Sequence, residues 1–137
     1  NTTQIKEYIK WAHRSDNLDL RCSSLYAMGK TGDSVWLDLL LQEFKNPEPA
    51  LRYEATNACA ELQEENAVPH LIPLIHDDDD LQVQLSAIQA LGVIGGSLAK
   101  KTLRRCAQSG DPAIEDAARI SLENVEAIED PLSFKQI

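Results

Sequence analysis

Few side chains in this sequence have the type and spacing that catalysis requires. His70 is a candidate acid–base residue, but no carboxylate lies at helical spacing from it. Ser23 and Ser24 have no histidine or lysine close in sequence, and no GxSxG motif occurs. The stretch "GVIGG" lacks the preceding strand and the lysine of a phosphate-binding loop. The sequence therefore predicts no catalytic residue, and we expect the protein not to be an enzyme.

Potential metal ligands are also scattered. Cys22, Cys59 and Cys106 are widely spaced and form no CxxC motif, which disfavours both a metal knuckle and a disulfide framework. The run Asp77–Asp80 lacks the alternating oxygen ligands and the glycine turn of a calcium loop. We therefore expect no metal site and no cofactor. Cysteines acting as small apolar residues favour a reducing compartment, the cytoplasm.

A group of four cations is the most unusual chemical feature. Lys100, Lys101, Arg104 and Arg105 lie close together in a chain with 13 basic and 22 acidic residues, a net charge of −9. Such a group could receive an acidic peptide or a phosphate group. The alternative is a solvated surface that pairs with nearby acids such as Asp77–Asp80, where each pair contributes only ~0–1 kcal/mol.

Composition limits the remaining possibilities. With 137 residues, 43% of them hydrophobic and 5% aromatic, the chain can form one domain with a helical core of aliphatic side chains. The net negative charge disfavours nucleic acid and anionic membrane as partners. No apolar stretch approaches the ~20 residues of a membrane span, and the polar start "NTTQIKEYIK" is not a signal peptide. Because residue 1 is Asn, we expect a fragment of a longer chain.

The elements that must position these residues form a repeat. The stretch "DDDDLQVQLSAIQALGVIGG" (77–96) has apolar or small residues at i, i+4, i+7, i+8 and i+11 from Val83, one face of a helix. The same offsets hold from Leu51 and Ile114 and, up to i+8, from Leu20. These four anchors are 31, 32 and 31 residues apart. A period of this length is typical of stacked helical hairpins.

A second helix follows in each unit with the same period. Apolar or small residues fall at i, i+3, i+4 and i+7 from Leu37, Val68 and Ala99. The anchors are 31 residues apart in both steps. The helix at 3–14 follows this second-helix pattern, with Ile5, Tyr8, Ile9 and Ala12 as its apolar stripe. Two ladders with one period predict an all-α fold, a right-handed α-solenoid of about four stacked antiparallel hairpins.

We expect residues 1–137 to form a single domain. Its parts are a capping or half-repeat helix at 3–14, hairpin units at 16–45, 46–76 and 77–108, a terminal helix at 111–128 and a tail at 131–137. The expected helix N-caps are Ser34, Asn46, Asn66, Asp80 and Asp111. Small residues at i+4 and i+7 of the first helices, such as Ala55 and Ala58, predict that neighbouring helices approach closely.

At these residues the sequence resembles the HEAT-repeat family, closest to the short-repeat subgroup named for the phycobilisome lyases. The matching stretches are "LRCSSLYAMGKTGD", "LRYEATNACAELQEENAVPHLIPLI" and "DLQVQLSAIQALGVIGG", within residues 16–125. The family pattern of Val-Arg or Leu-Arg followed by Ala-Leu-Gly is only partly kept, since Gln84 and Glu115 replace the arginine. The resemblance implies a scaffold that binds other proteins.

Some relatives in the family are enzymes. Deoxyhypusine hydroxylase binds iron through His-Glu pairs, but here His13, His70 and His76 are followed by Arg, Leu and Asp. HEAT-like DNA glycosylases need a basic groove, which the net charge of −9 argues against. A lyase-like or enzyme-accessory domain that holds a small ligand or pigment in the same groove stays open as the alternative function.

The predicted binding surface is the concave side, formed by the second helices. On each of these helices, positions i+2 and i+5 point away from the buried stripe. We therefore expect a monomeric scaffold that binds another protein or peptide through a strip of the third-unit cations and four further residues. These eight residues are Leu39, Gln42, His70, Pro73, Lys100, Lys101, Arg104 and Arg105. In the first unit we expect an exposed Leu39 flanked by Asp38 and Glu43.

Overall fold

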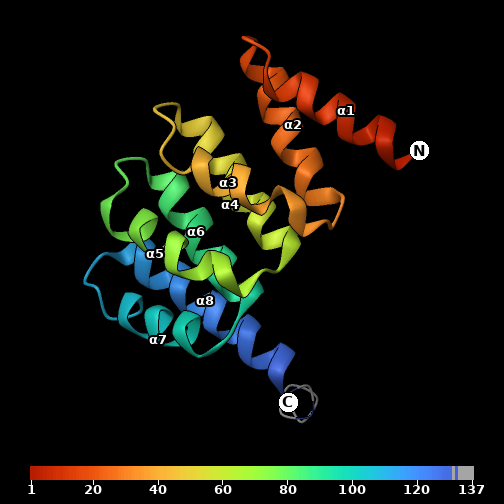
Figure 1. The fold of residues 1–137 in the computed structure, drawn as a ribbon. Helices are drawn as coiled ribbons and strands as arrows, with labels where there is room; N and C mark the ends of the chain where they lie inside the picture. The colour runs from red at the N-terminus through yellow and green to blue at the C-terminus, as the bar shows by residue number, and fades with distance from the viewer. Residues whose placement is uncertain (131, 133–137) are drawn as a thin grey trace. The chain divides into compact units, whose positions relative to one another are not determined.

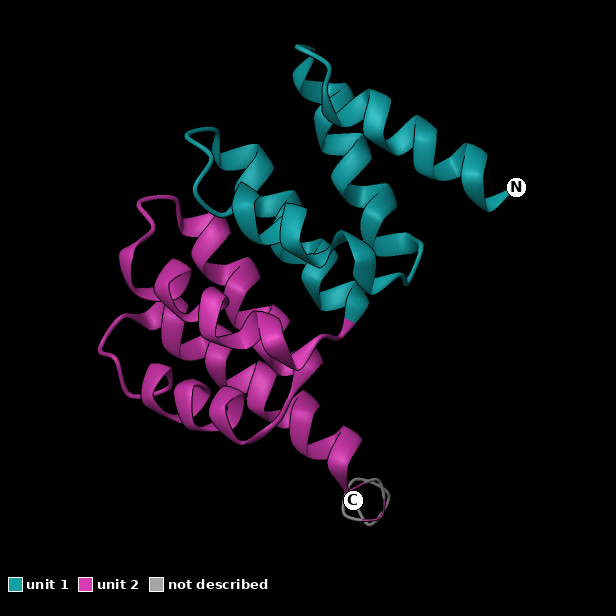
Figure 2. Ribbon diagram, in the orientation of Figure 1, with its two compact units in different colours: residues 1–62 teal, residues 63–137 magenta. Residues whose placement is uncertain are grey.

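A computed structural model describes residues 1–130 and 132. Within them the chain is all-α, with eight α-helices, two short 3-10 helices and no strand. The predicted fold class, an α-solenoid of stacked helical hairpins, is confirmed. The chain divides into two compact units, residues 1–62 and 63–137 (Figure 2). The predicted tail, 131–137, lies outside the described residues except for Leu132.

Unit 1 holds four α-helices and one 3-10 helix. These are α1 (Thr2–His13), α2 (Leu18–Lys30), η1 (Ser34–Trp36), α3 (Leu37–Glu43) and α4 (Pro49–Leu62) (Figure 1). The first helices α2 and α4 pack on each other, while α1 packs on α2 and α3 packs on α4. Met28 and Leu40 are completely buried, as their places on the apolar stripes require, and Leu25 is completely buried beside the stripe of α2.

Unit 2 repeats this arrangement. It contains η2 (Glu65–Ala67), α5 (Val68–Asp77), α6 (Leu81–Ile94), α7 (Ser97–Cys106) and α8 (Pro112–Glu129). The first helices α6 and α8 pack on each other, and the second helices α5 and α7 lie side by side and cover them (Figure 1). The core is formed by Ile88, Leu91, Leu71 and Leu103, all completely buried.

Small residues let the first helices approach closely, as the sequence predicts. A Cβ built on Gly29 of α2 would lie 2.8 Å from the Cα of Ala58 in α4. A Cβ on Gly92 of α6 would lie 2.8 Å from the Cβ of Ser121 in α8. Neither distance is possible between real atoms, so both helix pairs depend on glycine at the contact.

The helix caps are only partly as predicted. Asp80 and Asp111 cap α6 and α8, since their Oδ1 atoms accept hydrogen bonds from first-turn backbone N–H groups. Asn46 does not cap α4, which begins at Pro49; its side chain instead accepts a bond from the N–H of Glu48 at 2.8 Å. The predictions for Ser34 and Asn66 are wrong, because a 3-10 turn precedes each second helix and moves the cap positions to Asp33 and Glu64.

Helix α1 is less buried than its stripe predicts. Ile9 and Ala12 are completely buried, but Ile5 and Tyr8 are 50% and 54% exposed. Within unit 1, α1 packs on α2, and this contact covers only part of the stripe. The Tyr8 ring lies against Trp11, itself 59% exposed, with ring centroids 5.9 Å apart. In the described part of the chain, no helix is long and apolar enough to cross a membrane.

Candidate functional site

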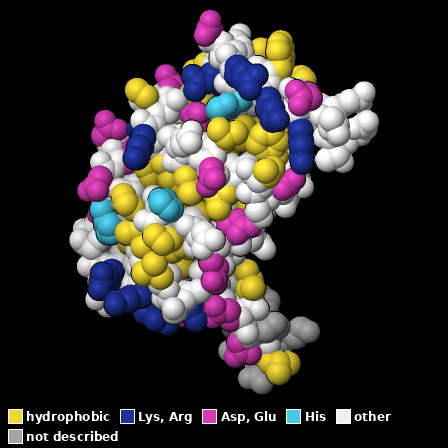
Figure 3. Space-filling model, in the orientation of Figure 1, with side chains coloured by type: hydrophobic (Ala, Val, Ile, Leu, Met, Phe, Trp, Pro, Cys, Tyr) yellow, Lys and Arg dark blue, Asp and Glu magenta, His cyan; other side chains and the backbone are white. Residues whose placement is uncertain are grey.

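Helix α7 carries its four cations on one side because its other side is buried. The chain enters α7 through Gly95 and Gly96, whose φ angles of +76° and +91° suit glycine. The stripe Ala99, Thr102, Leu103 and Cys106 is buried in unit 2, which leaves Lys101, Arg104 and Arg105 exposed. Lys and Arg side chains gather over α7, at the lower left of Figure 3.

The four cations are not equivalent. Lys100 is half-buried, and its Nζ lies 2.8 Å from Oε2 of Glu129 in α8. Its ammonium group is therefore already paired, whereas the sequence predicted Lys100 only as one of the four cations of the binding strip. In residues 1–130 and 132, neither Lys101 nor Arg104 nor Arg105 forms an ion pair. The expected alternative, that Asp77–Asp80 neutralise the strip, is thus not what the structure shows for these three.

Helix α5 lies next to α7 and supplies the other predicted residues of unit 2. His70 and Pro73 are both exposed, as expected from their i+2 and i+5 positions. By the 31-residue period they correspond to Lys101 and Arg104 on α7. Figure 3 shows hydrophobic side chains over α5 beside the basic ones over α7. We call the exposed surface formed by His70, Pro73, Lys101, Arg104 and Arg105 the α5–α7 face.

The predicted residues of the first unit lie on α3. Gln42 is exposed, but Leu39 is only partly exposed, because α3 is a short helix of seven residues that packs on α4. Both belong to unit 1, whereas the α5–α7 face belongs to unit 2. The predicted residues of α5 and α7 therefore lie together within unit 2, whereas Leu39 and Gln42 belong to unit 1.

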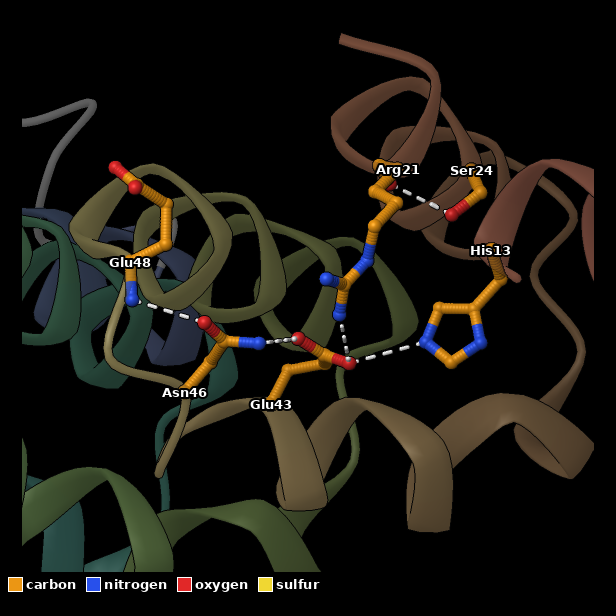
Figure 4. Close-up of polar contacts among 6 residues, drawn as sticks. All are labelled: His13, Arg21, Ser24, Glu43, Asn46 and Glu48. Carbon is orange, nitrogen blue, oxygen red and sulfur yellow. Dashed lines mark hydrogen bonds and ion pairs between the residues drawn. The ribbon is translucent and has the colours of Figure 1, made fainter. Parts of the chain in front are cut away.

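Glu43, predicted to flank an exposed strip, is instead buried. It is 7% exposed, and its carboxylate is the centre of a polar cluster in unit 1 (Figure 4). His13 Nε2 donates to Oε1 at 3.0 Å, and the Arg21 guanidinium lies 3.6 Å from the same oxygen. Asn46 Nδ2 donates to Oε2 at 3.1 Å. We call His13, Arg21, Glu43 and Asn46 the Glu43 cluster.

The Glu43 cluster joins the ends of three helices. His13 is the last residue of α1, Arg21 lies in the first turn of α2, and Glu43 ends α3. A buried carboxylate needs such donors, because desolvation without them would be costly. His13 and Arg21 have no helical spacing to Glu43, and only Asn46 lies three residues from it, so the pattern of a single helix could not reveal the cluster. The only sequence signal was an acid beside the buried Phe44.

The potential metal ligands and the three thiols are the remaining reactive groups. In the described part of the chain, no group of three or more His, Cys, Asp or Glu side chains is arranged to hold a metal ion. The three thiols are free, with Cys59 and Cys106 buried and Cys22 partly exposed. Burial raises the pKa of Cys59 to about 12 and also raises the pKa of Cys106. Such thiols are poor nucleophiles near neutral pH.

Known proteins place this fold in context. Residues 5–92 match the family model of HEAT repeats. Among solved structures, the chain resembles human deoxyhypusine hydroxylase in complex with glycerol, with a TM-score of 0.76 and 18% sequence identity. The alignment covers 89% of this chain and 43% of that one, so the chain spans less than half of the enzyme's length. No curated protein matches the sequence.

These comparisons correct one prediction. From the sequence we expected a chain that is not an enzyme, yet the fold is that of an enzyme with HEAT-like repeats. Helical repeats occur in binding proteins and enzymes alike, so missing motifs were not a sound basis for that exclusion. At 18% identity the likeness shows the fold alone. The subgroup of the phycobilisome lyases stays a prediction, whereas the match over residues 5–92 is sufficient for the wider assignment: the chain belongs to the HEAT-repeat family.

Proposed function

We propose that this chain is a helical-repeat scaffold that binds another protein or peptide through the α5–α7 face of unit 2. The observation that carries the proposal is the side-by-side placement of two second helices with exposed residues at equivalent positions. Side chains held on packed helices are ordered before binding, which lowers the entropy cost of recognition. In unit 1, Gln42 and the partly exposed Leu39 are the corresponding candidate contacts on α3.

A photocrosslinking experiment tests this proposal. A benzophenone amino acid would replace His70 or Pro73 on α5 and, as the matched control, Ile120 on α8. Ile120 is 50% exposed, so all three positions are accessible to a partner. We expect the same cellular protein to be crosslinked from His70 and Pro73 but not from Ile120. Equal crosslinking from Ile120, or crosslinking from that position alone, would contradict binding through the α5–α7 face.

A second candidate function is a repeat domain that holds a substrate within an enzyme. The likeness to deoxyhypusine hydroxylase favours it, because that enzyme uses the same fold. The two candidates differ in what happens to the crosslinked protein when it is purified and incubated with the chain. Intact-protein mass spectrometry would find an unchanged mass for a binding partner, and a covalent change of mass for a substrate.

A further inference from the structure

We propose that the partner segment lying on α7 is an acidic peptide in an extended conformation, held by Lys101, Arg104 and Arg105. This proposal rests on the proposed function, since it names the class of partner for the α5–α7 face. It differs from that function in its evidence, which is the charge and spacing of the cations rather than the placement of the helices.

The first argument is that these cations are available. Helix α7 has four basic residues and no acidic one, although acids outnumber bases by 22 to 13 in the chain. Lys100 shows that an acid within reach does pair, because its Nζ meets Glu129 at 2.8 Å. Lys101, Arg104 and Arg105 have no such partner in residues 1–130 and 132. An external carboxylate would therefore not need to displace an internal one.

The second argument is the spacing of the cations along the helix. Lys101 and Arg105 are four residues apart, which is about 6 Å along the helix axis. Alternate side chains of an extended peptide are about 7 Å apart on one side of its backbone. Acids at alternate positions of a partner strand thus match Lys101 and Arg105. Arg104 lies between them in sequence and can add a forked, bidentate contact to a carboxylate.

A neighbouring apolar side chain adds to the expected preference. Leu98 precedes Lys101 by three residues, so it lies on the same side of α7, and it is 45% exposed. The exposed Pro73 of the adjacent α5 borders this surface. The expected ligand is therefore a short peptide with an apolar residue beside acids at alternate positions. Contact with Leu98 would exclude water near the ion pairs and so strengthen them.

The small number of unpaired cations disfavours nucleic acid and anionic membranes as ligands of this face. Proteins that bind nucleic acid electrostatically neutralise about 6–10 phosphates, and anionic membranes attract clusters of about 4–8 Lys or Arg. The α5–α7 face offers only Lys101, Arg104 and Arg105 as unpaired cations, in a chain with a net charge of −9. Three localised charges fit a short acidic peptide better than an extended polyanion.

Fluorescence anisotropy with defined probes tests the proposal. The main probe is a fluorescein-labelled peptide that begins with Leu and continues with alternating Glu and Ser, and the control peptide has Gln in place of Glu. The binding variant is K101E/R104E. The matched control is R14E/K45E, which makes the same change in net charge at two exposed residues of unit 1. A single-stranded oligonucleotide and vesicles containing phosphatidylserine serve as competing probes.

We expect the Glu peptide to bind the wild-type chain and the R14E/K45E variant with similar affinity. K101E/R104E should bind it at least about tenfold more weakly, a change of about 1.4 kcal/mol. The Gln peptide should not bind. Equal loss in both variants would show that net charge alone matters and would overturn the proposal. So would the absence of Glu-peptide binding, or preferential, variant-sensitive binding of the oligonucleotide or the vesicles.

Two further measurements keep these outcomes interpretable. Circular dichroism checks that K101E/R104E is folded, and K101Q/R104Q provides a milder variant that should weaken binding by an intermediate factor. The crosslinking result separates this proposal from the proposed function. If His70 and Pro73 capture a partner while the Glu peptide does not bind, the acidic-peptide proposal fails and the binding function stands. If the peptide binds but no partner is captured through α5, the acidic-peptide site on α7 stands and the extension of the binding surface to α5 fails.

Discussion

Replacing Glu43 tests whether the buried carboxylate holds the ends of α1, α2 and α3 together. Glu43→Gln keeps the size of the side chain but removes its charge, and Glu43→Ala removes all its polar atoms. In the native cluster the carboxylate accepts hydrogen bonds from His13 at 3.0 Å and Asn46 at 3.1 Å. It also pairs with Arg21 at 3.6 Å. Both variants leave these donors without their charged acceptor.

The expected cost follows from burial and the number of contacts. A hydrogen bond to a buried charged group contributes about 1.5–3 kcal/mol. His13 and Arg21 keep 20% and 30% of their side chains exposed and can regain contact with water, so the costs of the three lost contacts do not add in full. We expect Glu43→Ala to destabilise unit 1 by about 2–3 kcal/mol, and Glu43→Gln by roughly half as much. For a unit of this size, the larger loss lowers Tm by on the order of 10–20 °C.

The positions of the tryptophans provide the assay. The chain has two, Trp11 and Trp36, and both belong to unit 1. Trp36 is buried, so its fluorescence in a urea titration reports the core of unit 1, while circular dichroism reports the helices of both units. The Glu43 variants should lower the urea midpoint seen by fluorescence more than the midpoint seen by circular dichroism, because the second signal includes the helices of unit 2.

A matched control removes a carboxylate of the same type from the surface. Glu61 pairs with Lys30 at 3.1 Å, and both side chains are 50% exposed. Glu61→Gln should leave the fluorescence midpoint nearly unchanged, because exposed pairs contribute little. Equal midpoints for Glu43→Gln and Glu61→Gln would refute a structural role for the Glu43 cluster. A double-mutant cycle with His13→Gln would then measure any remaining coupling between His13 and Glu43.

Three further predictions concern unit 2 and the thiols. Gly92→Val should destabilise unit 2 by about 1–3 kcal/mol in thermal unfolding, because even a Cβ at this position would lie 2.8 Å from Ser121 Cβ. Asp80→Ala should cost about 1 kcal/mol by loss of the α6 cap, whereas Asp77→Ala, which removes no cap, should change unfolding little. Iodoacetamide should label Cys59 only after unfolding, as read by mass spectrometry, since its pKa of about 12 leaves little thiolate. The unfolded thiol ionises near pH 9.0 and the folded one only near 12, so this group also makes stability fall as pH rises between these values.

The sequence predicts the fold well because the repeat carries redundant information. Leu40 of α3 and Leu71 of α5 occupy the same position of the second-helix ladder, and both are completely buried. A position that recurs every 31 residues must satisfy the same packing in each copy, so the stripe in one unit supports its assignment in the next. Ser121 lies at the i+7 position of the first-helix ladder, where small residues predicted a close approach, whereas its neighbour Gly92 lies outside that ladder.

The sequence predicts a helix surface less well when a neighbouring helix decides its environment. Glu43 lies next to the apolar stripe of α3 and is not part of it, so the spacing predicted an exposed side chain. It is nevertheless buried, because His13 and Arg21 reach it from α1 and α2. Tyr8 shows the opposite error, since its place on the stripe predicted burial and it is 54% exposed. Helical periodicity gives direction from one axis but does not show what lies there.

The pairing of charges has the same limit, and it determines which cations can bind a partner. Acidic residues outnumber basic ones, with a net charge of −9, so the sequence alone would allow every cation of the basic strip to be paired with an acid. In the structure Arg21 pairs with the buried Glu43 and Lys100 with Glu129, because packed helices bring these acids within reach. Lys101 and Arg104 point away from the helices that pack on α7, so no acid of unit 2 pairs with them in the described residues. An acidic chain can thus keep a locally basic surface when its acids are held elsewhere by the fold, and such a surface selects for acidic partners.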